Sequence, residues 1–228
     1  RSGTSAITRG LKVLGVELGD RLMPAVEGNN AKGFWEDVDV SALNFEMLRL
    51  LGLEWHGLIE LTSLEMEQLR SKGYVIQAVE ILRKKVANCP VFAFKDPKVA
   101  KLLPFWLEVF EHCKFETEYV LTLRHPRSVA KSLAARDALD LEVGYWLWVE
   151  HLLSGLSGSM NCRRILIDYD RLMRQPDAEI NRLANWLTLR VDASALEQFK
   201  TDFLDESLRH THYLPQDLAL DNRCPALV

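Results

Sequence analysis

Hydrophobic residues follow two kinds of pattern along the chain. Short, continuously apolar runs occupy Val91–Phe94, Tyr119–Leu123 and Ile165–Ile167, and runs of this length indicate strands buried on both faces, as in a parallel sheet. Between these runs, apolar residues recur every three or four positions, which predicts amphipathic helices. Strands that alternate with helices form right-handed βαβ units. We therefore predict an α/β fold with three layers, α/β/α, around a central, mainly parallel sheet.

The spacing of apolar residues also predicts where helices begin and end. A first stripe covers Ile7–Leu14 and stops at Gly15, and Ser41 is typical of an N-cap for a helix that ends at Gly52. The remaining stripes cover Val75–Val86, Leu141–Leu156 and Ile180–Leu187. No repeat or linker interrupts the pattern, so we expect residues 1–228 to form one domain with an irregular tail at 215–228.

Composition narrows the class of protein. Of the 228 residues, 48% are hydrophobic and 26% are charged, which is the balance of a soluble globular protein. The net charge of −4 offers no general attraction for nucleic acid or for an anionic membrane surface, and we expect neither as a partner. No apolar run approaches the roughly 20 residues that a membrane-spanning helix needs. An anion site in this chain must therefore be local.

The four cysteines are scattered without metal-ligand spacing or a C-x-x-C pair. This usage favours a reducing compartment, and we expect the protein to be cytoplasmic. The chain begins at Arg1 rather than at methionine. We expect that residues precede it, among them a first strand of the sheet, and a targeting signal or anchor could lie there as well.

Polar and charged groups follow each predicted strand. The sequence after the first strand is Lys-Asp-Pro at 95–97, that after the second is Arg-His-Pro at 124–126, and that after the third is Asp-Tyr-Asp at 168–170. Open α/β sheets bind ligands beyond the carboxyl ends of their strands. The three segments together therefore predict a binding site at one edge of the sheet.

The first residues of the chain are suited to an anion. Arg1, Ser2, Gly3, Thr4 and Ser5 lead directly into the first predicted helix, so that a cation, a glycine and hydroxyls meet at a helix N-terminus. Backbone N–H groups point outward there and favour phosphate or sulfate. The segment is not a Walker A motif, because a Gly-Lys-Ser/Thr sequence is absent. An ordinary helix cap is the alternative interpretation.

A second anion-binding element follows the second predicted strand. Arg124 ends that strand, Pro126 suits the first turn of a helix, and Ser128 and Ser132 share one face of that helix. A guanidinium and a hydroxyl that converge in this way suit a terminal phosphate. The alternative is surface charge beside a helix start.

Taken together, these motifs resemble those of the sulfotransferases that use 3′-phosphoadenosine 5′-phosphosulfate (PAPS) as donor. The opening Arg-Ser-Gly-Thr-Ser is similar to the family's 5′-phosphosulfate loop, and Arg124 with Ser132 is similar to its 3′-phosphate motif. The Lys-Asp-Pro and Asp-Tyr-Asp-Arg-Leu segments also resemble family motifs, the former in the bacterial and tyrosylprotein branches. As a whole the chain resembles the bacterial, glycan and tyrosylprotein types more than the cytosolic small-molecule enzymes. The resemblance covers residues 1–187 and implies a fold like that of the P-loop NTPases.

The resemblance assigns roles residue by residue. Arg1, Ser2, Gly3, Thr4 and Ser5 would bind the 5′-phosphosulfate, Arg124 and Ser132 the 3′-phosphate, and Tyr169 the adenosine, while Lys95 would reach the transferring group. The C-terminal Arg-Lys-Gly loop of the cytosolic small-molecule enzymes is absent. Arg209 would supply a late cation instead, or it is an ordinary surface arginine.

Sulfuryl transfer needs a proton acceptor and cations for the leaving oxygen. Arg1 and Lys95 would serve as those cations, and we expect no metal; a salt bridge from Lys95 to Asp96 is the alternative. Glu36 resembles the family's glutamate base by position, whereas His56 is the histidine alternative and a structural Glu36 is the third. The acceptor would be a hydroxyl on a sugar or another alcohol or phenol, and 3′-phosphoadenosine 5′-phosphate (PAP) would be the product.

Two other functions are compatible with the sequence. Residues 164–168 (Arg-Ile-Leu-Ile-Asp) resemble a Walker B strand, so a P-loop kinase is one alternative. A non-catalytic nucleotide-binding protein is the other. Binding of PAP in preference to ATP would separate the sulfotransferase from the kinase.

Overall fold

The structure, a computed structural model, describes residues 2–26, 30, 32–54, 61–204, 213, 216–219, 221–226 and 228. Its central sheet pairs β1 (Glu118–Leu123) with β2 (Arg163–Asp168) in parallel, with Val120 opposite Ile165 and Leu121 opposite Leu166. Both elements were predicted as strands, and the α/β class is confirmed.

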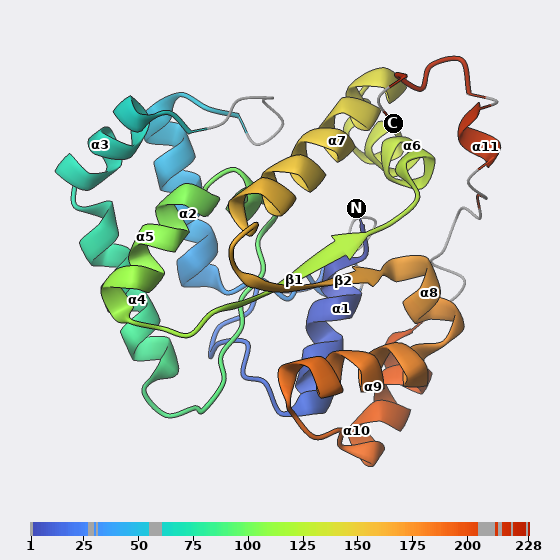
Figure 1. Cartoon of the computed structure of the whole chain (residues 1–228), viewed down its shortest axis with the longest axis horizontal. Coiled ribbons are helices and arrows are strands. Elements are labelled where there is room, and N and C mark those ends of the chain that lie inside the picture. Colours follow the sequence, from blue (N-terminus) through green and yellow to red (C-terminus); the bar gives the residue numbers. More distant parts are fainter. Residues whose placement is uncertain are drawn as a thin grey trace.

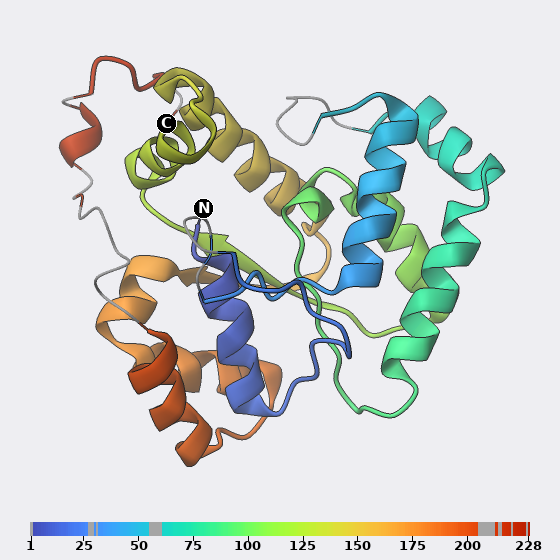
Figure 2. The same ribbon diagram turned by 180° about the vertical axis from the view of Figure 1, so that it is seen from behind.

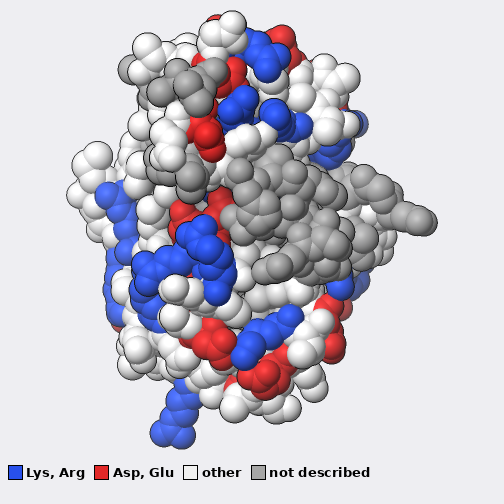
Figure 3. Space-filling model, turned by 90° about the vertical axis from the view of Figure 1, so that its right-hand side faces the viewer, with Lys and Arg blue, Asp and Glu red and all other residues white. Residues whose placement is uncertain are grey.

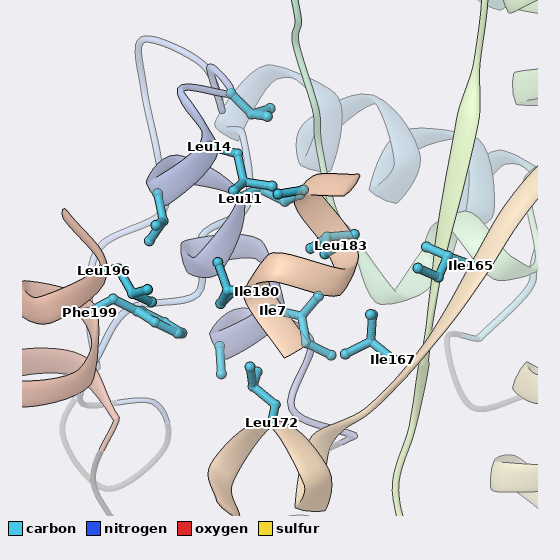
Figure 4. Packing of buried hydrophobic residues seen from close by; sticks show 14 of the residues in the cluster. Ile7, Leu11, Leu14, Ile165, Ile167, Leu172, Ile180, Leu183, Leu196 and Phe199 are labelled. Atoms are coloured by element: carbon cyan, nitrogen blue, oxygen red, sulfur yellow. The ribbon is translucent and has the colours of Figure 1, made fainter. Parts of the chain in front are cut away.

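One face of the sheet packs against the first helix of the chain and against helices that follow β2. Ile165 and Ile167 of β2 are buried in a cluster with residues of α1 (Thr4–Leu11), α8 (Tyr169–Arg174), α9 (Pro176–Leu187) and α10 (Ala193–Gln198). Figure 4 shows Ile7 of α1 and Leu172 of α8 beside Ile167. We call this group the α1 cluster.

The opposite face of the sheet carries α6 (Pro126–Asp137) and α7 (Leu141–Gly158) (Figure 1). A Cβ atom on Gly155 of α7 would lie 3.3 Å from the Leu121 side chain of β1. Gly144 lets α7 approach α6 closely, because a Cβ there would lie 2.8 Å from the Ala130 Cα. The predicted α/β/α layers are therefore present.

Four further helices form a lobe beside the sheet: α2 (Val38–Leu51), α3 (Ser63–Ser71), α4 (Tyr74–Val86) and α5 (Leu103–Cys113). Figure 2 shows them together on one side of the molecule. They bury a separate cluster that includes Met47, Leu69, Ala78, Phe105 and Trp106. We call this group the α2–α5 cluster.

The predicted strand at Val91–Phe94 is wrong as a full strand. Among the described residues, the segment pairs through a single parallel bridge between Glu17 and Phe92. The Glu17 N–H donates to the Val91 carbonyl over 3.1 Å, and the Ala93 N–H donates to the Glu17 carbonyl over 2.8 Å. The partner segment is short, because Gly15 and Gly19 on either side of Glu17 both have a positive φ.

Helix ends agree with the sequence only in part. Gly15 and Gly52 end their helices in the left-handed conformation, as predicted. The predicted N-cap at Ser41 is wrong, because α2 begins at Val38 and Asp37 accepts hydrogen bonds from the N–H groups of its first turn. The tail that was expected to be irregular contains one short helix, α11 (Gln216–Ala219).

Three further observations concern the helices, the cysteines and the surface charge. Within the described ranges, no helix has the length and apolar content that crossing a membrane requires. Cys89, Cys113, Cys162 and Cys224 are free thiols. On the face shown in Figure 3, basic and acidic side chains lie side by side, in keeping with the small net charge.

Candidate active site

A cavity of about 2400 Å³ runs along the whole of β1, from Glu118 to Arg124 just beyond its carboxyl end, and extends along the α2–α5 lobe. It brings together the predicted site residues that the structure describes: Ser2, Gly3, Thr4, Ser5, Glu36, Lys95, Arg124, Ser132 and Tyr169 all line it. Arg1, Arg209 and the alternative base His56 lie outside the described residues. Segments far apart in the sequence therefore line one cavity.

A glycine with positive φ holds the first loop against Tyr169. Gly3 has a φ of 78°, and a Cβ there would lie 2.0 Å from the Cδ2 atom of Tyr169. Only glycine fits this position, because both its backbone conformation and its contact exclude a side chain. The guanidinium of Arg124 lies over the same tyrosine ring, 4.8 Å from its centroid. The loop, the end of β1 and the start of α8 therefore meet at Tyr169.

The start of α1 is open to an anion. No side chain of the described residues caps this helix, whose first two bonded amides, Ala6 and Ile7, both donate to the Gly3 carbonyl. Uncapped N–H groups at a helix N-terminus attract a phosphate or sulfate group. The hydroxyl of Ser5 is used differently, since it donates to the Phe34 carbonyl over 3.1 Å and accepts from Asn30 over 3.1 Å. Ser5 thereby ties the loop to the segment that carries Glu36.

The second anion-binding element is fixed by α6 and α7. Pro126 stands in the first turn of α6 as predicted, and both Ser128 and Ser132 line the cavity. The indole N–H of Trp148 on α7 donates to the Arg124 carbonyl over 3.0 Å. The backbone at Arg124 is therefore held in place while its side chain reaches Tyr169.

Glu36 and Lys95, which both line the cavity, form a buried ion pair. The Lys95 Nζ is 2.5 Å from the Glu36 Oε1, and their side chains are 14% and 7% exposed. Burial raises the pKa of Glu36 above its ordinary value, although the charge of Lys95 opposes the shift. Burial likewise lowers the pKa of Lys95, against the charge of Glu36. Each shift favours the neutral form, which makes proton exchange at this pair easier.

Lys95 was also considered as a salt-bridge partner of Asp96, and that alternative is wrong. Asp96 lies 2.9 Å from the Nζ of Lys98 and accepts the Nδ2–H of Asn44 over 3.1 Å. Asn44 in turn accepts the Trp106 indole N–H over 2.9 Å, and both of these side chains are fully buried. The segment that carries Lys95 is thus anchored to the core of the lobe. Sequence reasoning missed Asn44, which reads as an ordinary polar residue of a helix.

A cluster of charged side chains around Lys85 supports the segment that carries Glu36. The ammonium of Lys85 contacts Asp20, Asp37 and Asp39, at 2.9 Å from Asp37 and 2.7 Å from Asp39. Burial alone would lower the pKa of Lys85, but the three carboxylates raise it well above its ordinary value. The negative charges of the three aspartates are thus offset by the ammonium of Lys85. Since Asp37 caps α2 and follows Glu36, the cluster fixes the approach of Glu36 to the cavity.

The residue proposed as a Walker B acid has a structural contact. Asp168 ends β2, and its carboxylate accepts the Arg171 N–H over 2.8 Å as the N-cap of α8. The same turn places Tyr169 against Gly3. The geometry of Asp168 is therefore explained by the start of α8.

Comparison with known proteins defines the class of this fold. A solved structure with the same fold is the sulfotransferase domain of the olefin synthase of Synechococcus PCC 7002, with a TM-score of 0.51 and 19% sequence identity. The match covers 95% of this chain and 82% of that domain. Neither the known protein-family models nor the curated proteins include a match. The fold is that of a sulfotransferase domain.

Proposed function

We propose that the protein is a sulfotransferase that moves a sulfuryl group from PAPS to an acceptor hydroxyl. One observation carries the proposal: both anion-binding elements and the Glu36–Lys95 pair line a single cavity of a sulfotransferase fold. An isolated cap or a surface arginine would not need to share a cavity with a buried acid–base pair. The convergence of these residues supports a donor site next to a transfer site.

The donor would bind across the start of α1 and the end of β1. The uncapped N–H groups at Thr4 and Ser5, which follow the left-handed turn at Gly3, suit the 5′-phosphosulfate. Arg124 and Ser132 suit the 3′-phosphate, because a guanidinium and a hydroxyl can bind several oxygens of one phosphate. Tyr169 contacts both Gly3 and Arg124 and would contact the adenosine between the two anionic groups. The residues present therefore fit PAPS.

Glu36 and Lys95 would carry the transfer. The acceptor oxygen forms a bond to sulfur, the bond from sulfur to the bridging oxygen breaks, and PAP leaves with that electron pair. Glu36 takes the acceptor's proton and becomes neutral, which frees the Lys95 ammonium from its partner. That ammonium then offsets the negative charge on the leaving oxygen. With these charges in the protein, we expect transfer without a metal ion.

The acceptor is proposed as a hydroxyl of a glycan or of another alcohol or phenol. Burial raises the pKa of Glu36 above its ordinary value, which makes its carboxylate a stronger proton acceptor for such a hydroxyl.

Calorimetric binding of PAP, ADP and ATP tests the donor assignment. We expect PAP to bind, and ADP and ATP to bind at least tenfold more weakly, because they lack the 3′-phosphate that Arg124 and Ser132 would contact. Transfer of label from PAPS to a panel of sugars, tyrosine peptides and phenols should then proceed in EDTA. Preferential binding of ATP, or activity that depends on Mg²⁺ and ATP, would instead establish the kinase alternative.

A further inference from the structure

One face of α7 forms a wall of the cavity that the proposed mechanism does not use. Trp148 and His151 lie about one helical turn apart and both line the cavity, as does Gly155 one turn further on. Trp148 is bonded to the end of β1 at Arg124, and Gly155 packs on Leu121 in the middle of β1. His151 therefore lies along β1, between its middle and its carboxyl end, where the predicted site is.

The two acceptors around His151 determine its tautomer. Its Nδ1 atom is 2.9 Å from the Leu147 carbonyl oxygen and 2.7 Å from the Glu150 Oε2. A carbonyl oxygen can only accept a hydrogen bond, so the contact with Leu147 places the hydrogen of the neutral imidazole on Nδ1, where the negative charge of Glu150 is also close. The Nε2 atom then carries a lone pair and acts as a hydrogen-bond acceptor.

The partner of His151 is itself held in a buried ion pair. The Glu150 side chain is 13% exposed and lies 3.5 Å from the Nζ of Lys101, whose side chain is 3% exposed. Lys101 directly follows the 3₁₀ turn Pro97–Ala100, and that turn follows Lys95 in the chain. Buried ion pairs contribute little net stability, but this one ties the orientation of His151 to the segment that carries Lys95.

We propose that His151 is an acceptor-binding residue whose Nε2 accepts a hydrogen bond from a second hydroxyl of the acceptor. This inference rests on the proposed function and deepens it, because Glu36 would accept the reacting proton and His151 is a separate hydrogen-bond acceptor from another element that lines the same cavity. A molecule that satisfies both must present two hydroxyl groups. The site therefore selects polyhydroxylated acceptors, such as sugars or diphenols, over simple alcohols and phenols.

The test compares acceptors that differ only in the second hydroxyl. Catechol, resorcinol and hydroquinone place that hydroxyl at three spacings, and phenol lacks it. With labelled PAPS, we expect the wild-type protein to favour at least one diphenol over phenol by about tenfold in kcat/KM, the value of one good hydrogen bond. In His151→Ala that ratio should fall toward one. His151→Gln should recover part of it, because the amide oxygen can accept a hydrogen bond.

His112 provides a matched control. Its Nδ1 lies 2.8 Å from the Glu108 carbonyl, the same contact one turn back along a helix, but it is exposed and does not line the cavity. His112→Ala should keep the wild-type ratio. PAP affinity should be unchanged in all three variants, because none of them alters a proposed donor residue. Thermal unfolding of each variant shows whether loss of the contacts of His151 with Leu147 and Glu150 affects the fold.

Several results would overturn the inference. A wild-type protein without preference for any diphenol, or a preference that persists in His151→Ala, would remove His151 from acceptor recognition. A large loss of PAP affinity in His151→Ala would place it at the donor instead. If no phenol is turned over, calorimetric affinity of the PAP complex for the four compounds replaces kcat/KM, with the same ratios expected. Failure of the proposed function is distinct, because the wild-type protein would then not bind PAP.

Discussion

The two ends of the cavity are built in different ways. The donor end, around Gly3, Arg124 and Tyr169, consists of groups at the start of a helix or the end of a strand, and the backbone places them. The transfer end consists of Glu36 and Lys95, which are 59 residues apart and meet only as side chains. Buried networks behind each of them, around Lys85 and Asn44, keep that contact in place.

Because of this difference, we expect substitutions at the two ends to affect different quantities, either donor affinity or turnover. Groups at the donor end can be removed singly, because the backbone that carries them stays in place. At the transfer end each charge is the buried partner of another, so a substitution leaves an uncompensated group. We therefore expect the first region to control donor affinity and the second to control turnover and stability.

The largest effect is expected for Glu36→Gln. A general base contributes ~10²–10⁴-fold, so kcat should fall by that factor while PAP affinity stays near wild type. Since burial raises the pKa of Glu36 above its ordinary 4.5, wild-type activity should fall as the pH drops through this raised pKa. That acidic limb should be absent from the residual activity of the variant. The pH–rate profile, with the exposed Glu46→Gln as control, checks both statements. Near-normal turnover would show that Glu36 is structural, or that His56 is the base.

Lys95→Ala should lower kcat by ~10²–10³, because a donor aimed at the developing charge is lost. PAP affinity should change far less, since the donor end is placed independently. Steady-state kinetics and calorimetry on the same preparation make the comparison, with the exposed Lys84→Ala as the matched lysine control. Equal losses in kcat and in PAP affinity would mean that the two ends are not separable.

Lys85→Met should reduce stability more than any substitution at the donor end. It removes the cation shared by three carboxylates, of which Asp37 is fully buried. Breaking a buried pair costs ~3–5 kcal/mol, and the low end applies because Asp20 is largely exposed. For a chain of this size that is a decrease in Tm of roughly 6–12 °C. Thermal unfolding measures it, and Lys84→Met on the adjacent exposed position should leave Tm unchanged.

The smallest of these effects is expected at the donor end. Arg124→Ala removes a charged hydrogen-bond partner of the 3′-phosphate, at a cost of ~1.5–3 kcal/mol. PAP should bind at least tenfold more weakly, while AMP, which has no 3′-phosphate, should bind almost as before. Titration of both nucleotides tests this. A parallel loss for AMP would point to the contact between Arg124 and Tyr169 rather than to the phosphate.

The sequence predicts the donor end better than the transfer end. Strand ends, a glycine before a helix and a proline in a first turn are local signals, and they correctly placed β1, β2 and the groups that follow them. The pairing of Glu36 with Lys95 depends on how two distant segments fold together. No local pattern determines such a contact, and the nearest acid in sequence, Asp96, was the wrong partner.

The sequence also contains signals for the starts of α3 and α2 that the helix predictions above do not include. Thr62 and Glu65 form a capping box at the start of α3, and the Thr-x-x-Glu spacing is visible in the sequence. At α2 the error arose because Ser41 and Asp37 are both good N-caps. Val40, Leu43 and Met47 are buried at helical spacing, so the apolar stripe itself begins before Ser41 and favours Asp37.

The separation of the two hydrophobic clusters has a consequence for local unfolding. The α1 cluster and the α2–α5 cluster are distinct, and the cavity has wall residues from both. Each cluster can therefore exchange its amide hydrogens as its own cooperative unit, with its own opening free energy. If the proposed nucleotide binds only when both units are closed, its binding couples their openings. In hydrogen-exchange experiments PAP should raise the protection of α4 and α5, far from the donor residues, together with that of α1.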